Sequence, residues 1–135
     1  MTWSDLLGNS TEAILLVAVG AFVGANLRYG VGLVVDSSLL STAAVNVLGC
    51  YALGVLFYEG RFVEVVSERS RRVLGTGLLS SFTTYSTFVL DTVTAAPATG
   101  LGYLFGSYAL GFAGVVLGRE TVQRVAGSPL GAGEG

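Results

Sequence analysis

The sequence predicts an all-α membrane protein built from four transmembrane helices. Its 135 residues are 52% hydrophobic and only 12% charged, with a mean hydropathy of +0.71, whereas soluble domains carry about a quarter charged residues. Four hydrophobic runs are each long enough to cross about 30 Å of hydrocarbon at about 1.5 Å per residue. We therefore expect one transmembrane domain, residues 1–135, with spans at 13–35, 39–58, 73–96 and 101–118 and a flexible C-terminal tail at 119–135.

The first span combines a pair of small residues with a cation. Gly20 and Gly24 are four residues apart, a spacing that lets a second helix approach closely. Arg28 follows about two thirds along the span, where a cation is costly and usually faces protein, water or an anion. Two interpretations are equally open. Arg28 reaches the interface or a structural partner, or it lies at the entrance of an anion path.

The second and fourth spans each carry one pair of polar residues at i, i+4 spacing, so that both members share a helix face. The pairs are Thr42 with Asn46 and Tyr103 with Ser107. For each pair, contact with a neighbouring helix is the simpler interpretation. Lining of a polar route is the alternative.

The third span contains the most unusual stretch, GTGLLSSFTTYSTFVLD at Gly75–Asp91. Nine of its seventeen residues carry a polar side-chain group, more than helix packing usually needs. On a continuous helix four of them would form one polar stripe, with two aromatic rings on an adjoining face. This pattern predicts the wall of a route for a polar species. The stripe is Ser80, Thr84, Thr87 and Asp91, and the rings are Tyr85 and Phe88.

The polar groups within the spans favour an anion over a cation. They are mostly hydroxyls and one amide, which donate hydrogen bonds, together with one arginine and one acid. Aromatic ring edges carry the positive part of the quadrupole and can also face an anion. A helix broken within SSFTTYS would add free N–H groups. The chain has no histidine, a single cysteine, no phosphate-binding loop and no close carboxylate pair, so we expect no enzyme.

Four motifs, in this order, resemble the Fluc family of fluoride channels, the CrcB-type proteins. The resemblance covers all four spans, and its TTxSTF core with VNxxG is specific. It implies a fluoride-selective passive channel that exports fluoride from the cytoplasm and relieves fluoride toxicity. The motifs are GAFVGANLRYGVG (Gly20–Gly32), TAAVNVLGCYALG (Thr42–Gly54), FTTYSTFVLD (Phe82–Asp91) and YLFGSYALG (Tyr103–Gly111).

The resemblance also implies antiparallel pairs of subunits with two fluoride pores at their interface, and a third helix broken at the TTxSTF motif. A sodium ion would be held by the backbone carbonyls of Ser80 and Thr83. The partners expected are fluoride, membrane lipid and a second subunit, and no nucleic acid. Matched to the motifs, the pore residues are Thr42, Asn46, Tyr85, Phe88, Tyr103 and Ser107, the charged vestibule residues are Arg28 and Asp91, and the polar stripe adds Thr84 and Thr87 to the pore lining.

Two positions depart from the family's pattern. Tyr85 stands where phenylalanine is usual, and Ser80–Ser81 stands where a glycine pair is frequent. Serine adopts unusual backbone angles less readily than glycine does, which weakens the prediction of a sodium site. Both departures fit a subunit whose altered site is complemented by a second, related chain.

The arginines predict a single orientation. The N-terminus, the 59–72 connection and the C-terminal tail share one side of a four-span chain, and six of the seven cations lie there. The 36–38 and 97–100 connections hold none. By the positive-inside rule both termini are cytoplasmic. An antiparallel partner would then be a different, oppositely biased chain, and the 59–72 connection should form a short surface helix with Glu–Arg pairs.

Two other functions are weighed against the channel. A small multidrug exporter has a similar length and helix count but needs a carboxylate within its first span. The first span has Arg28 and no acid after Glu12. The second alternative is a non-conducting or structural subunit of a heterodimeric fluoride channel, which the two departures keep open.

Overall fold

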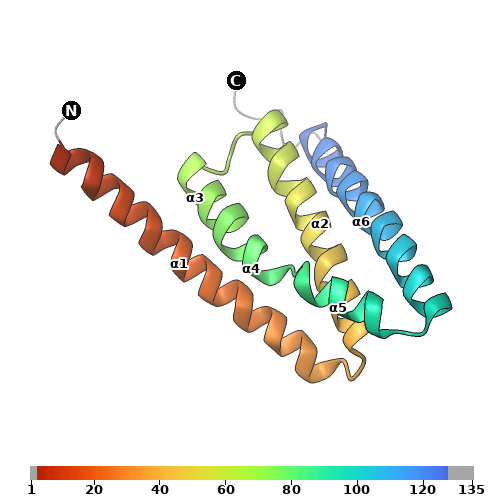
Figure 1. Cartoon of the computed structure of the whole chain (residues 1–135). Helices are drawn as coiled ribbons and strands as arrows, with labels where there is room; N and C mark the ends of the chain where they lie inside the picture. The colour runs from red at the N-terminus through yellow and green to blue at the C-terminus, as the bar shows by residue number, and fades with distance from the viewer. Residues whose placement is uncertain (1–2, 128–135) are drawn as a thin grey trace.

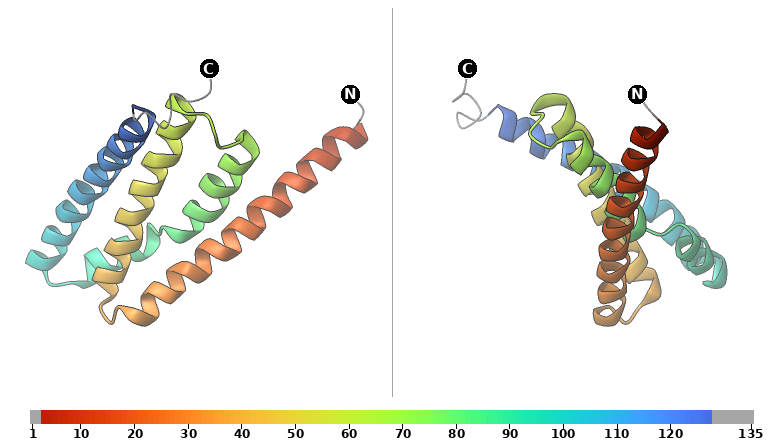
Figure 2. Two further views of the ribbon diagram at one scale, coloured as in Figure 1. Left: turned by 180° about the vertical axis from the view of Figure 1, so that it is seen from behind. Right: turned by 90° about the vertical axis from the view of Figure 1, so that its left-hand side faces the viewer.

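The computed structural model describes residues 3–127, of which the first seven are described by their backbone alone. Four antiparallel segments lie side by side in the order α1, third span, α2, α6 (Figures 1 and 2). The third span is divided into several short helices. The elements are α1 (Trp3–Val34), α2 (Ser38–Phe62), α3 (Glu68–Arg72), the π-helical segment η1 (Val73–Leu79), α4 (Ser80–Phe82), α5 (Ser86–Thr94) and α6 (Pro97–Ala126).

Within the described part of the chain, four helical segments are long and apolar enough to cross a membrane. They cover Ser10–Val34, Ser38–Phe62, Glu68–Thr94 and Pro97–Ala126. Little of their apolar surface is buried within the chain, and large side chains such as Phe22 (72% exposed) and Phe112 (70% exposed) point outward. Hydrocarbon is the solvent that such a surface requires. The fold class predicted from the sequence, an all-α membrane protein of four spans, is confirmed.

The helices extend beyond the predicted hydrophobic runs, most of all at the start of α1 and at the end of α6. The expected tail at 119–135 is wrong for its first part, because α6 continues to Ala126. Two contacts with α2 hold this part of α6: the Arg119 guanidinium lies over the Tyr58 ring at 5.8 Å, and the Thr121 and Tyr51 hydroxyls are 3.2 Å apart. The Val122 side chain, which follows Thr121 in the sequence, is buried. Residues 128–135 lie outside the described part.

Glycine allows two pairs of segments to approach closely. In α1, a Cβ at Gly20 would lie 2.7 Å from the Val73 carbonyl oxygen, and one at Gly24 would collide with the Leu78 carbonyl oxygen. Between α6 and α2, a Cβ at Gly118 would lie 2.5 Å from the Tyr51 carbonyl oxygen. Because lipid chains are as apolar as leucine, such close backbone contacts supply much of the association between spans.

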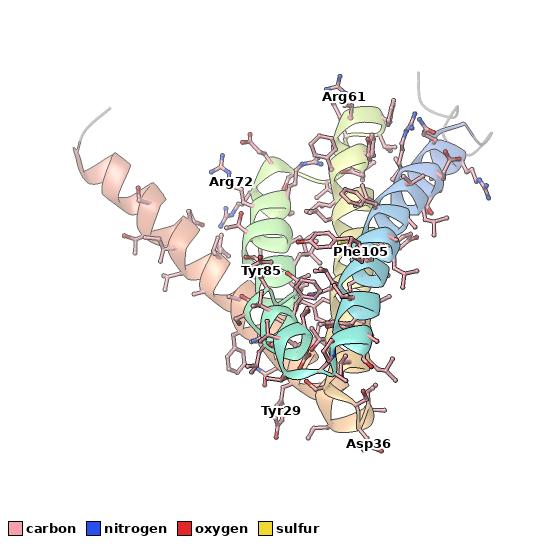
Figure 3. All side chains as sticks on the ribbon, turned by 45° about the vertical axis from the view of Figure 1, so that its right-hand side comes forward. Tyr29, Asp36, Arg61, Arg72, Tyr85 and Phe105 are labelled. Atoms are coloured by element: carbon pink, nitrogen blue, oxygen red, sulfur yellow. The ribbon has the colours of Figure 1, made fainter. Side chains whose placement is uncertain are left out.

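The two ends of the bundle differ in charge. The start of α1, the end of α6 and the loop between α2 and α3 lie at one end, where Figure 3 places Arg61 and Arg72. Tyr29 and Asp36 lie at the opposite end. The short α3 confirms the predicted surface helix, since Ser67 caps it and Arg72 pairs with Glu68 at 2.8 Å.

An ion pair ties the α2–α3 loop together at the arginine-rich end. Arg71 Nη2 lies 3.1 Å from Glu59 Oε2, and Arg71 Nη1 donates to the Leu56 carbonyl at 2.6 Å. Glu59 Oε1 accepts from the backbone N–H groups of Val65 and Val66 at 2.6 and 2.7 Å. Arg71 is therefore bonded to several groups of this loop, whereas its exposed neighbours Arg69 and Arg72 each pair with one carboxylate, Glu12 and Glu68.

Candidate ion pathway

The helix of the third span is interrupted at residues 83–85. α4 ends at Phe82, Thr83 is extended with φ −79° and ψ 161°, and α5 begins at Ser86. The Thr83 hydroxyl donates to the Leu79 carbonyl at 3.0 Å, which closes the end of the first half. Backbone N–H and C=O groups of the residues that follow are thereby released from helical pairing within the membrane, where each needs another partner.

The side chain of Asn46 in α2 forms hydrogen bonds with both backbone groups of Thr84, its carbonyl and its N–H. Its Nδ2 donates to the Thr84 carbonyl at 2.9 Å, and its Oδ1 accepts from the Thr84 N–H at 2.8 Å. The Thr84 hydroxyl lies 3.0 Å from that of Thr87 and accepts from the Thr87 N–H at 3.3 Å, so it caps the start of α5. A single amide side chain thus replaces the helical bonds that the break removes.

A partly open groove of about 580 Å³ runs beside the break between α2, α6 and the third span. Its apolar walls include Leu53, Leu79, Phe112 and Val115. Few polar groups interrupt them, which is typical of a site that orients a ligand with a small number of contacts. Seven of the predicted site residues line this groove: Asn46, Ser80, Thr83, Thr84, Tyr85, Phe88 and Ser107.

Two aromatic rings from the start of α5 face the groove in different ways. Tyr85 is 72% exposed, whereas Phe88 is 7% exposed, and their ring centroids are 6.1 Å apart. Phe88 packs against two tyrosines of α6, Tyr103 at 5.4 Å and Tyr108 at 5.8 Å in an edge-to-face arrangement. The Phe88 ring is held in a defined orientation by these contacts, while Tyr85 is open to a partner.

A buried polar cluster lies between α5, α2 and α6. Asp91 is 8% exposed, and its Oδ1 accepts from the Ser38 hydroxyl at 2.7 Å. The Tyr103 hydroxyl lies beside Asp91, Thr42 and Ser107. Within the described residues, neither the Tyr103 hydroxyl nor Asp91 Oδ2 has a hydrogen-bond partner. Such buried orphan groups need a further partner, such as water or an ion.

Arg28 reaches the break from the other side of the third span. Its Nη1 donates to the Thr83 carbonyl at 3.2 Å, and its side chain is partly buried. The sequence left open whether Arg28 contacts a structural partner or lies at the entrance of an anion path. The structure shows a contact with a structural partner, the Thr83 carbonyl.

Both residues whose backbone carbonyls are predicted to hold sodium line the groove. Ser80 is in the last turn before the break, and no hydrogen bond to its carbonyl is found in residues 3–127, because the N–H of Thr84, four residues on, binds Asn46. Carbonyl oxygens of an unwound helix suit a sodium ion. The donor chemistry therefore fits, although the Thr83 carbonyl already accepts from Arg28.

The structure separates residues that a continuous helix would have aligned. Because of the break, Ser80 does not share a helical face with Thr84, Thr87 and Asp91, so the polar stripe is wrong as a single stripe. Thr42, Tyr103 and Asp91 belong to the buried cluster beyond the groove, and Thr87 bonds the Thr84 hydroxyl at the start of α5. The roles of these side chains toward an ion remain predictions.

Two residues at the site were not predicted from the sequence. Ser38 anchors Asp91, and Tyr108 holds the Phe88 ring. Ser38 resembles an ordinary helix-start serine, and Tyr108 is one of six tyrosines. Only the position of α5 against α2 and α6 distinguishes them.

Comparison with known proteins connects this arrangement with ion channels. Residues 15–119 match the family model described as "CrcB-like protein, Camphor Resistance (CrcB)". A relative from Haloarcula marismortui, "Fluoride-specific ion channel FluC 1", is 50% identical over 87% of this chain and 91% of its own length. "Fluoride-specific ion channel FluC 1" of Natronomonas pharaonis is 42% identical over 83% of this chain and 95% of its own. "Fluoride-specific ion channel FluC 2" of Halobacterium salinarum is 46% identical over 83% of this chain and 88% of its own length.

Proposed function

This chain belongs to the CrcB family of fluoride-specific ion channels, and from that premise we propose that fluoride crosses the membrane passively along the groove beside the broken third span. The chain is an ion channel and not an enzyme. The observation that carries the proposed route is the break at residues 83–85, held by Asn46 and flanked by Tyr85 and Phe88. Efflux of fluoride, but not of chloride, from liposomes tests it.

The groove offers hydrogen-bond donors in an apolar surrounding. Asn46 Nδ2 has two N–H groups, of which one is committed to the Thr84 carbonyl. Within the described residues the second makes no other bond and is available to an anion, and the helix dipole at the start of α5 also favours negative charge. Fluoride is small and strongly hydrated, so only closely spaced donors offset its dehydration. Chloride is too large to gain the same contacts.

The Phe88 ring supplies a weaker positive surface along the same route. Its packing against Tyr103 and Tyr108 fixes which part of the ring faces the groove. Aromatic ring edges are positive and attract anions without holding them tightly. Conduction requires such moderate binding, because an ion that binds too strongly does not leave.

The buried cluster continues the route beyond the ring. The Tyr103 hydroxyl, which has no hydrogen-bond partner among the described residues, can donate to fluoride, with Thr42 and Ser107 beside it. Asp91, held by Ser38, places a carboxylate beside this hydroxyl, and its negative charge limits how long an anion stays. Fluoride that leaves the cytoplasm by this route would relieve fluoride toxicity.

The open side of the groove calls for a second subunit. Tyr85 is 72% exposed and the groove is not closed by this chain. We assign the closing surface to an antiparallel partner that brings a second Tyr85–Phe88 pair or its equivalent. A sodium ion at the Ser80 and Thr83 carbonyls would supply positive charge at the junction of the two chains.

The partner is a different chain with the opposite arginine bias. Arg61 and Arg72 lie at one end of the bundle and Asp36 at the other, and six of the seven cations belong to the first end (Figure 3). Such a bias directs insertion with both termini in the cytoplasm. The numbered names FluC 1 and FluC 2 among the relatives are compatible with a second, related subunit.

A topology reporter fused to the C-terminus of the chain, expressed alone, is expected to give a signal from the cytoplasmic side only. A reporter fused after Ala96, in the loop before α6, serves as the control and should report the opposite side. Comparable C-terminal signals from both sides would contradict a single orientation and restore a pair of identical chains.

A charge-inverted copy of the chain can replace the unknown partner. It keeps every residue of the groove and of the buried cluster, and it moves the arginines from one end to the other, which should reverse its insertion. Arg71 is retained because it ties the α2–α3 loop. The substitutions, all at exposed positions, are Arg61→Ser, Arg69→Ser, Arg72→Ser, Arg119→Ser and Arg124→Ser with Asp36→Arg, Ala98→Arg and Thr99→Arg.

A further inference from the structure

We infer that Arg28 is the resident cation of the helix break, and that it competes with a metal cation for the Thr83 carbonyl. The inference deepens the proposed function and rests on it for the sodium site. It concerns how one side chain of α1 controls that site.

The position of Arg28 follows from the packing of α1. Gly24 lets α1 approach the third span so closely that a Cβ would collide with the Leu78 carbonyl oxygen. Arg28 is one helical turn further along the same face. Its guanidinium therefore arrives at the break, where Nη1 donates to the Thr83 carbonyl at 3.2 Å. Snorkelling to the interface would have turned this side chain away.

The break needs positive charge at this point. Thr83 is extended, so its carbonyl is not directed along the helix axis toward a backbone N–H four residues on. The Ser80 carbonyl has no hydrogen-bond partner in the described part of the chain, because the N–H of Thr84 donates to Asn46 instead. Carbonyl oxygens left without partners at membrane depth are destabilising. The guanidinium of Arg28 stabilises at least one of them in the single chain.

Two cations bound to the Thr83 carbonyl at the same time would repel each other. A metal ion on the Thr83 oxygen would lie within a few ångströms of the guanidinium, and like charges repel strongly where water is scarce. Arg28 is able to withdraw, because the bond to Thr83 is the one guanidinium hydrogen bond found for it in residues 10–127. Arg28 thus satisfies the break before the subunits pair and gives up the Thr83 carbonyl when a metal ion binds there.

The test measures sodium binding through thermal unfolding. The chain is paired with its charge-inverted copy, and sodium chloride is replaced by N-methylglucamine chloride at constant ionic strength. With Arg28→Gln in both chains, the sodium concentration that gives half of the stabilisation should fall about tenfold, because one repelling charge is removed. Arg28→Lys keeps the charge and should behave like the parent.

The control is Arg61→Gln in the parent chain, an exposed arginine at the end of α2 that the charge-inverted copy already lacks, and it should leave the sodium midpoint unchanged. An Arg28→Gln midpoint equal to that of the parent would overturn the competition. Thermal unfolding that does not depend on sodium in either protein would also overturn the competition. If Arg28→Lys shifts the sodium midpoint as Arg28→Gln does, the charge of Arg28 is not the cause. Fluoride efflux is recorded on the same samples, so the loss of this inference and the loss of the channel function are distinguishable.

Discussion

Replacing Phe88 with isoleucine in both paired chains is expected to lower fluoride efflux by at least about tenfold, a barrier increase of about 1.4 kcal/mol. The substitution removes the ring edges from the route but keeps a large apolar side chain between Tyr103 and Tyr108. Folding should survive, because hydrophobic swaps of similar volume usually cost less than about 1.5 kcal/mol. The measurement is the efflux rate per reconstituted pair, with the thermal midpoint as the check on folding.

Two further variants make the Phe88 result specific. Phe105→Ile changes a ring that is 68% exposed on α6 (Figure 3) and should leave efflux unchanged. Tyr85→Phe restores the ring pair usual in the family and should keep or raise efflux. If Phe88→Ile conducts like the parent, this ring belongs to packing alone and the route must lie elsewhere.

Replacing Asn46 with leucine is expected to destabilise the fold by about 2–6 kcal/mol and to abolish efflux. The loss follows from two partly buried backbone groups of Thr84 that lose their partners at membrane depth, at about 1–3 kcal/mol each. With Thr84 released, the start of α5 and the Phe88 ring lose their fixed position. Thermal unfolding of the paired protein measures the first effect, and efflux at a temperature well below the midpoint measures the second.

Asn26 provides the matched control for this substitution. Its amide also bonds a backbone carbonyl, that of Phe22 at 2.7 Å, but within its own helix and on the exposed face of α1. Asn26→Leu should therefore change stability by about 0.5 kcal/mol or less and leave efflux intact. Equal destabilisation by the two substitutions would mean that Asn46 does not hold the break.

The four spans were predictable from the sequence because hydrophobic length alone specifies a membrane helix. Their ends were less so, since hydropathy does not register the contacts of Arg119, Thr121 and Val122 that continue α6 beyond the apolar run. The π-helical form of η1 has no sequence signal that we recognise. Its glycines, such as Gly77 against α1, show only that the packing is close.

The site was predictable to the extent that its chemistry is local. The density of hydroxyls around Thr84 indicates a polar route within the third span, and Asn46 is an amide in an otherwise apolar helix. The pairing of Asn46 with Thr84, of Arg28 with Thr83 and of Ser38 with Asp91 was not predictable, because each joins residues 38 or more positions apart. A periodicity argument also assumes a continuous helix, and it failed where the helix is interrupted.

Anion efflux from liposomes tests the channel assignment most directly. The chain is reconstituted with its charge-inverted copy, and fluoride and chloride release are followed under an imposed potential. The account predicts rapid fluoride release, chloride release no faster than from protein-free liposomes, and little fluoride release from the chain alone. Equal rates for the two anions, or no fluoride release from the paired chains, would contradict it.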